Sequence, residues 1–236
     1  MSISDNLDNV RSRIDAAARR AGRTAADVTI IAVSKTFTPS HVREAWQAGQ
    51  RDFGENKVQE GLQKIAQTAD MPGLRWHLIG HLQSNKVRKA ATSFACIHSV
   101  DSLELLRKLD AAAAALSDGV PRPEVLIQVD LAGEATKHGA PLDAAERLVR
   151  EALSVQGVTL AGLMLLPPWN EDPEQTRPWF VRLREFRNQL IASGVPAAAV
   201  RHLSMGMSHD FEAAVEEGAT LVRVGTAIFG KRQASA

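Results

Sequence analysis

The feature that most constrains the fold of this chain is a repeated alternation of short apolar runs with longer stretches of helical periodicity. The runs are VTIIAVS (28–34), DFGE (52–55), RWHLIG (75–80), CIHSV (96–100), EVLIQVDL (124–131), TLAGLMLL (159–166), RHLSM (201–205) and LVRVG (221–225). Runs that are apolar on both faces and alternate with helices predict a parallel sheet covered by helices. Eight such units in 236 residues predict an α/β fold, a single (β/α)8 TIM barrel.

Apolar residues at helical spacing predict one additional amphipathic helix over residues 3–21, ending at Gly22. Further helices are predicted over 141–153 and 175–191. A doubly wound open sheet is the alternative fold, but no G-x-G-x-x-G motif follows the first apolar run. Because no linker or shift in composition divides the chain, we expect one domain over residues 1–236.

Composition and charge narrow the class of protein. The formal net charge is +1, which gives no sign of a nucleic-acid or membrane surface. No apolar run approaches the roughly 18 residues of a membrane span, and the N-terminal segment lacks the apolar core of a signal peptide. The single cysteine, Cys96, lies in an apolar run and is expected to be a buried, inert thiol. We therefore expect a soluble cytoplasmic protein.

Ligands of such barrels bind at the carboxyl ends of the strands, so the residues that follow each run are informative. The first run ends at Ser34 and is followed by Lys35. Partial burial disfavours the ammonium form of a lysine and favours the amine that attacks an aldehyde to form an imine. The alternative is a lysine that extends from the strand end into solvent, and Lys35 taken alone favours this alternative.

The ends of the last two runs carry residues typical of phosphate binding. These residues are Ser204, Gly206, Ser208, Gly225 and Thr226. Ser208 is a candidate N-cap for a helix that begins near His209, and helix N-termini favour anions. Barrels often hold phosphate between the loops after strands 7 and 8. The alternative is that these residues form only tight turns and caps.

Arg223 shares one face of the eighth run with Leu221 and Gly225. Since a barrel strand faces either the helices or the interior, the guanidinium is expected near the core, where it needs a partner. An imine-forming lysine, a phosphate cradle and this arginine together predict a phosphorylated aldehyde as the ligand.

Long blocks of the sequence resemble the pyridoxal phosphate homeostasis proteins. This family, also described as proline synthase co-transcribed homologues, is similar to the N-terminal barrel of alanine racemase. The blocks are VSKT (33–36), FGENKVQE (53–60), WHLIGHLQSNK (76–86), HSVDS (98–102), GEATKHG (133–139), GLMLLPP (162–168), LSMGMSHDFEAA (203–214) and VRVGTAIFG (222–230). The resemblance runs from about residue 7 to residue 230 and implies a fold-type III barrel that binds pyridoxal 5′-phosphate (PLP).

The resemblance also implies roles for the matching residues. It places the PLP Schiff base on Lys35 and the pyridine nitrogen opposite Arg223. The phosphate-binding stretch matches Ser204, the amides around Gly206, Ser208, Gly225 and Thr226. Asn56, His81, Asn85 and Met164 fall in family motifs near the mouth. A cation opposite the ring nitrogen keeps that nitrogen unprotonated and makes the ring a poorer electron sink, which weakens carbanion chemistry.

Two departures from relatives bear on function. Many relatives carry a second lysine two residues after the first, where this chain has Phe37, so Lys137 is the remaining candidate for a secondary acceptor. The chain has no tyrosine, whereas alanine racemases use one as the base on the opposite face of the cofactor.

Three functions are weighed. The resemblance favours a PLP carrier that stores the cofactor and supplies apo-enzymes, without conventional catalysis and as a monomer. A PLP-dependent amino-acid racemase is the alternative, but it needs a second base. A Schiff-base aldolase shares the lysine and phosphate site and leaves the family motifs unexplained. No metal is expected, because His77 and His81 straddle a strand end where their spacing does not converge on one ion.

Overall fold

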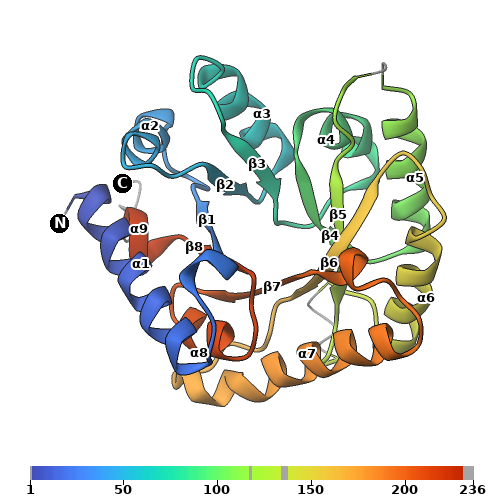
Figure 1. The fold of residues 1–236 in the computed structure, drawn as a ribbon. Helices are drawn as coiled ribbons and strands as arrows, with labels where there is room; N and C mark the ends of the chain where they lie inside the picture. The colour runs from blue at the N-terminus through green and yellow to red at the C-terminus, as the bar shows by residue number, and fades with distance from the viewer. Residues whose placement is uncertain (1, 117–118, 134–137, 231–236) are drawn as a thin grey trace.

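The computed structural model describes residues 2–116, 119–133 and 138–230, and its strands close into a parallel barrel in sequence order (Figure 1). The strands are β1 (Thr29–Val33), β2 (Asp52–Glu55), β3 (Arg75–Leu78), β4 (Cys96–Val100), β5 (Glu124–Val129), β6 (Thr159–Leu165), β7 (His202–Met207) and β8 (Leu221–Val224). The barrel predicted from the alternation is therefore confirmed. Each predicted run overlaps its strand, and the ends of run and strand agree to within two residues, including the short DFGE run.

Helices alternate with the strands and surround the barrel (Figure 1). They are α1 (Ile3–Arg20), α2 (Pro39–Gln47), α3 (Val58–Gln67), α4 (Val87–Ser93), α5 (Leu103–Ala114), α6 (Leu142–Ala152), α7 (Arg177–Ala192), α8 (Phe211–Glu216) and α9 (Thr226–Phe229). Short 3-10 helices are η1 (Ala25–Asp27), η2 (Ser84–Lys86), η3 (Pro173–Thr176) and η4 (Ala197–Val200). The helices predicted over 141–153 and 175–191 correspond to α6 and to η3 with α7. No helix in the described ranges is long and apolar enough to cross a membrane.

Helix α1 is the extra N-terminal helix that the sequence predicts. It begins with a capping box, in which the Ser2 hydroxyl accepts from the Asp5 amide and the Asp5 carboxylate accepts from the Ser2 amide. Its apolar stripe is buried where it packs against α8 and α9. Gly22 follows the helix with φ of 67°, a left-handed conformation that glycine adopts without steric cost. The helix therefore braces the segment around β8, which carries part of the site.

The interior of the barrel combines apolar and polar side chains. A small apolar cluster fills part of it, formed by Ile31, Cys96, Leu126, Ala161, Met164 and Leu221. Buried polar side chains project from the neighbouring strands, among them His77, His98, Ser204 and Arg223. The larger apolar cluster takes in the buried faces of the helices and the alternate strand residues. Cys96 is buried as predicted, and burial raises the pKa of its thiol.

The segment between β7 and α8 differs from the sequence prediction. Helix α8 begins at Phe211, its N-cap residue is Asp210, and Ser208 lies three residues before the helix. The prediction of Ser208 as an N-cap is therefore wrong. The register between β7 and β8 shifts between Ser204 and Met207, and Gly206 within this stretch has φ of 89°. The residues that the sequence pattern assigned to the start of the helix therefore belong to the end of β7 and to the turn that follows it.

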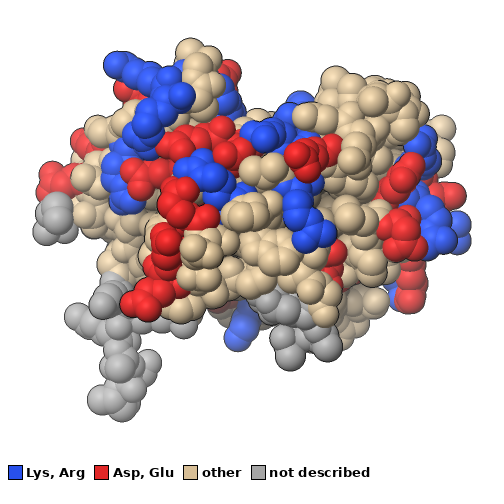
Figure 2. All heavy atoms as spheres, turned by 90° about the horizontal axis from the view of Figure 1, so that it is seen from below, with Lys and Arg blue, Asp and Glu red and all other residues tan. Residues whose placement is uncertain are grey.

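Charged side chains of both signs mix on the surface. Figure 2 shows one face, on which basic and acidic residues are interspersed. Ion pairs join α1, α7 and α8, including Arg13–Glu212 at 2.8 Å, Arg20–Glu216 at 2.6 Å and Arg177–Glu216 at 2.7 Å. Neither sign dominates the face in Figure 2, which agrees with the net charge of +1.

Candidate functional site

A pocket of about 600 Å³ opens at the carboxyl ends of the strands. It is lined by Val33, Lys35, Asn56, Ile79, Gly80, His81, Gln128, His138, Leu166, Trp169, Met207, Ser208, His209, Arg223, Gly225 and Thr226. This volume lies within the roughly 300–1,000 Å³ of small-molecule sites, and the position is where barrels of this type bind ligands. Of the predicted residues, seven meet here: Lys35, Asn56, His81, Ser208, Arg223, Gly225 and Thr226.

Lys35 lies in a tight turn directly after β1. The next residue, Thr36, has φ of 69°, the one positive value found outside glycine in the described ranges. A β-branched residue reaches this conformation only when its surroundings impose it. The Thr36 amide donates to Oε1 of Glu60 at 2.5 Å, and this contact fixes the turn from the side of α3. The backbone that carries Lys35 is thus held in one conformation.

A buried ion pair between Lys64 and Glu55 also holds this turn, through contacts with Ser34. Nζ of Lys64 donates to the Ser34 carbonyl oxygen at 2.6 Å and to Oε1 of Glu55 at 2.6 Å. The Ser34 hydroxyl also donates to that Glu55 oxygen at 2.6 Å. Burial raises the pKa of Glu55, and the hydrogen bonds from Lys64 and Ser34 oppose this rise. The second oxygen of Glu55 is buried without a hydrogen-bond partner in the described structure, so the carboxylate depends on Lys64 for its charge balance.

The segment after β8, the strand that pairs with β1, presents backbone amides that converge on one oxygen. The Ser208 hydroxyl accepts from the amides of Gly225 at 3.0 Å and Ala227 at 3.3 Å. Thr226 lies between these two amides and lines the pocket. The amide of Met207 donates to Asp210 at 2.6 Å, which fixes the end of β7. Converging amides and hydroxyls of this kind are the groups that bind a phosphate.

Arg223 reaches the pocket from β8 and is 3% exposed. Its Nη1 donates to the Ser204 hydroxyl oxygen at 2.6 Å and its Nη2 to the Leu165 carbonyl oxygen at 2.9 Å. Burial lowers the pKa of the guanidinium to about 10, which leaves it charged at neutral pH. The prediction that Arg223 lies near the core and has partners is confirmed, and these partners are neutral protein oxygens.

The rim of the pocket joins the predicted His81 to residues that were not sequence candidates for the site, namely Gln128, His138, Trp169 and His209. His81 and His138 stack with ring centroids 3.7 Å apart, and the His138 carbonyl oxygen accepts from the Gln128 amide at 2.6 Å. Trp169, 73% exposed, stacks near His209 with centroids 6.2 Å apart. A polar Gln128 inside an otherwise apolar run was the one signal that could have revealed this part of the pocket.

Four sequence candidates do not line the pocket. Ser204 is fully buried inside the barrel, where it bonds Arg223 and His98. Met164 belongs to the interior apolar cluster, and Asn85 is exposed in η2. A β-carbon at Gly206 would meet the Ala214 side chain at 2.6 Å, so this glycine permits the packing of α8. Lys137, the candidate secondary acceptor, lies outside the described residues.

Comparisons with known proteins identify the family of this chain. The family model for the alanine racemase N-terminal domain matches residues 6–233. A pyridoxal phosphate homeostasis protein of Aquifex aeolicus is 41% identical over 233 residues, covering 99% of this chain and all of the relative. One from Escherichia coli K12 is 41% identical over 240 residues, covering 99% and 98%.

Solved structures give the same result. PipY of Synechococcus elongatus, solved with PLP bound, is 38% identical with a TM-score of 0.84, covering 97% of this chain and 100% of that one. Its PLP-free form is 40% identical with a TM-score of 0.86 over the same shares. An alanine racemase of Clostridium difficile has a TM-score of 0.72 at 17% identity over 98% of this chain and 58% of that one, which shows a shared fold alone.

Proposed function

The chain belongs to the alanine racemase N-terminal domain family and, within it, to the pyridoxal phosphate homeostasis proteins, and on this basis we propose that it holds PLP as a Schiff base on Lys35. The protein would store the cofactor and supply it within the cell, without conventional catalysis. A PLP-bound structure of a relative at 38% identity supports the ligand assignment.

The observation that carries this proposal is the meeting of three chemically different groups in one pocket. Lys35 supplies a primary amine, the segment from Gly225 to Ala227 supplies converging amides, and Arg223 supplies a buried cation. An aldehyde, a phosphate and a ring nitrogen are the matching groups of PLP. When bound, PLP supplies an electrophilic aldehyde and an electron-accepting ring. The pocket volume of about 600 Å³ accommodates a molecule of this size.

The charge of Arg223 favours a carrier over an enzyme. Its side chain lines the pocket and is otherwise buried, and a buried cation disfavours protonation of a nearby ring nitrogen. An unprotonated ring stabilises a carbanion less well, so bond breaking at an amino-acid Cα gains little from the cofactor. Retention and release of PLP then remain the main tasks of the site.

A racemase is the second candidate function, and the observation that supports it is the stacking of the His81 and His138 rings in the pocket. Racemisation needs a second base, and the chain has no tyrosine to serve as one. The two histidines line the same pocket as Lys35 and have their rings stacked. Either imidazole has the chemistry of a general base.

Incubation of the PLP-loaded protein with L-alanine or D-alanine in D2O separates the two candidates. A carrier leaves the Cα hydrogen and the chirality of either isomer unchanged, as measured by mass spectrometry and chiral chromatography. An alanine racemase is the positive control. Deuterium at Cα together with formation of the opposite isomer would contradict the carrier function, and loss of both in His138→Ala would then identify the second base.

We further propose that the protein is a cytoplasmic monomer and that apo forms of PLP-dependent enzymes are its partners. Light scattering coupled to gel filtration tests the first point. Transfer is tested by mixing loaded protein with an apo-enzyme in the presence of excess pyridoxal phosphatase, which destroys PLP released to solution. Activation of the apo-enzyme under this condition supports direct transfer, and its absence contradicts it.

A further inference from the structure

A continuous chain of buried polar side chains runs through the interior of the barrel. Nε2 of His77 lies 2.9 Å from Oδ1 of Asp52, and Nδ1 of His77 lies 3.0 Å from Nε2 of His98. Nδ1 of His98 lies 2.9 Å from the Ser204 hydroxyl oxygen, which accepts from Nη1 of Arg223 at 2.6 Å. These five residues, called the interior relay below, are each less than 9% exposed.

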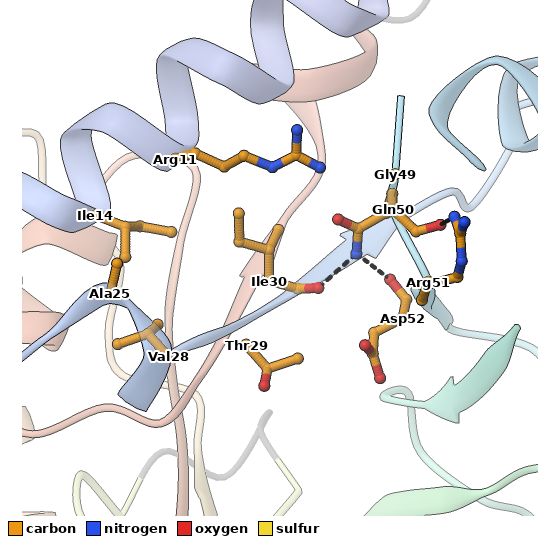
Figure 3. A pocket seen from close by; sticks show the side chains of 10 residues that line it. All are labelled: Arg11, Ile14, Ala25, Val28, Thr29, Ile30, Gly49, Gln50, Arg51 and Asp52. Atoms are coloured by element: carbon orange, nitrogen blue, oxygen red, sulfur yellow. Dashed lines mark hydrogen bonds between the residues drawn. The ribbon is translucent and has the colours of Figure 1, made fainter. Parts of the chain in front are cut away.

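The interior relay connects two pockets at opposite ends of the barrel. Asp52, the first residue of β2, lines a second pocket of about 370 Å³ at the amino ends of β1 and β2. Figure 3 shows this pocket, in which the side-chain amide of Gln50 donates hydrogen bonds to the backbone carbonyl oxygens of Ile30 and Asp52. Arg223 lines the pocket at the carboxyl ends. The bond between His98 on β4 and Ser204 on β7 crosses the interior, because these strands are not neighbours in the barrel.

For an ionised Asp52 and two neutral histidines, the hydrogen-bond partners allow one order of donors and acceptors. Asp52 also forms an ion pair with Arg75 at 2.8 Å. Burial of Asp52 opposes ionisation of the carboxyl, but the hydrogen bonds from His77 and Arg75 outweigh this effect and keep the pKa of the carboxyl below its ordinary value. An ionised Asp52 accepts from Nε2 of His77. With neutral histidines, His98 then donates from Nε2 to His77, and Ser204 donates to Nδ1 of His98. Each residue of the relay, beginning with Arg223, therefore donates a hydrogen bond to the next residue in the direction of Asp52.

This order relates two charges that do not touch. Both hydrogen-bond acceptors of Arg223, the Ser204 hydroxyl and the Leu165 carbonyl, are neutral, and the Asp210 carboxylate acts on the guanidinium through its charge. Aligned hydrogen bonds polarise one another in a low-dielectric interior, so a change at the Asp52 end of the relay reaches the hydrogen bond that holds Arg223. The charged or titratable groups that face His98 are His77, Arg223 and His202, and burial keeps the pKa of His98 well below its ordinary value. A neutral His98 is the form that this order requires.

The same histidines also form a group with Cys96, in which the donor atoms lie within 4.8 Å of one another. A metal would need a lone pair from each imidazole. In the described structure every ring nitrogen of His77 and His98 already has a protein partner. The interior relay accounts for these contacts without an ion.

We propose that Asp52, His77, His98 and Ser204 are positioning residues that orient the Arg223 guanidinium toward the cofactor pocket. The relay leaves three of the five N–H groups of Arg223 for a ligand or for other contacts. Its use toward a PLP ring rests on the proposed function, whereas the order of the relay does not. Asp52 and His77 act here without lining the cofactor pocket.

The first test uses the PLP-free protein labelled with ¹⁵N in histidine and arginine. Long-range ¹H–¹⁵N spectra at neutral pH are expected to show His77 and His98 neutral, with the proton on Nε2 in both. Spectra of His77→Gln and His98→Gln assign the signals. A proton on Nδ1 of either ring, or a doubly protonated His77, contradicts the order and overturns the proposal.

The second test measures how firmly Arg223 is held. His98→Asn keeps an acceptor for Ser204 but loses the bond to His77, and Asp52→Asn keeps the geometry but removes the charge. Both are expected to speed hydrogen exchange of the Arg223 guanidinium at least about tenfold, a result of losing one charge-assisted hydrogen bond. His202→Gln is the matched control, since His202 on β7 bonds Thr220 outside the relay. Unchanged exchange in folded variants overturns the proposal.

The third test links the relay to the ligand. Asp52→Asn is expected to weaken PLP binding by roughly tenfold and to shift the ¹⁵N signal of the pyridine nitrogen, with no such effect in His202→Gln. A merely structural role for Asp52 would leave that nitrogen signal unchanged, and this outcome overturns the proposed positioning. If the wild type binds no PLP, the proposed function fails, while the histidine tautomers and Arg223 exchange still decide for or against the relay.

Discussion

Nζ of Lys64 donates a hydrogen bond to the carbonyl oxygen of Ser34 at 2.6 Å, and so holds the backbone directly before Lys35. The same ammonium contacts Glu55 at 2.6 Å and Glu60 at 2.9 Å, and Glu60 in turn accepts from the Thr36 amide. The turn that presents the candidate Schiff-base lysine is therefore fixed on both sides by one buried lysine and its two carboxylates.

Replacement of Lys64 tests this support. Lys64→Met leaves the Glu55 carboxylate buried without its cation, and we expect a loss of about 3–5 kcal/mol in the free energy of unfolding, measured by urea denaturation. The double variant Lys64→Met with Glu55→Gln is expected to recover a good part of this loss, because no buried charge then lacks a partner. Lys108→Met, at an exposed i,i+4 pair, is the control and should change stability by less than about 0.5 kcal/mol. Equal losses in the single and double variants would contradict the ion-pair account.

Ser208 is predicted to matter for the phosphate and not for the rest of the ligand. In Ser208→Ala the amides of Gly225 and Ala227 lose the oxygen that aligns them, so PLP affinity should fall by about tenfold. The affinity for pyridoxal, which lacks the phosphate, should change far less. Isothermal titration with both ligands measures the difference, and Ser154→Ala on the exposed surface is the control. An equal loss for both ligands would place Ser208 elsewhere in binding.

His98 makes stability depend on pH in a defined direction. Burial holds the pKa of His98 well below 6.5 in the folded state, so below pH 6.5 the unfolded chain takes up a proton that the folded one does not. Stability is thus lost as the pH falls. Between pH 6.5 and 5.5 this one group removes up to about 1 kcal/mol. The free energy of unfolding, measured at several pH values in this range, should fall more steeply with decreasing pH in the wild type than in His98→Gln. An equal dependence on pH in the two proteins would show that the folded protein protonates His98 as readily as the unfolded chain does.

Gly206 is expected to serve packing. Its φ of 89° already disfavours other residues, and an added β-carbon would approach Ala214 to 2.6 Å. Gly194 has a similar φ of 96° but open space around it. Gly206→Ala should therefore destabilise the protein by about 1–3 kcal/mol more than Gly194→Ala, the cost of overpacking. Thermal denaturation measures both, and equal losses would show that backbone conformation alone explains this glycine.

The sequence was sufficient for the barrel and for the residues at its strand ends. Alternation of apolar runs with helices predicts the eight strands because parallel barrel strands are buried on both faces. Lys35 directly follows one of these runs, and Gly225 ends another. The burial of Arg223 also followed from strand periodicity, because alternate residues of a barrel strand face the interior.

Other parts of the site were not visible in the sequence for physical reasons. A hydroxyl at a strand end is compatible with either a ligand or an interior partner, so Ser204 was assigned to phosphate although the structure places it in the interior relay. The contact between His98 and Ser204 joins residues 106 positions apart, which no local pattern reports. Trp169 and His138 reach the pocket from loops, where periodicity gives no orientation.

The most direct test of the account is to treat the protein with PLP, reduce it with borohydride and locate the attached group by peptide mass spectrometry, with Lys35→Ala alongside. We predict a pyridoxyl group on Lys35 of the wild type and no stable attachment in the variant, although the variant retains Ser208 and Arg223. Attachment at another lysine in the wild type, or no attachment at all, would contradict the assignment of this pocket to PLP held by Lys35.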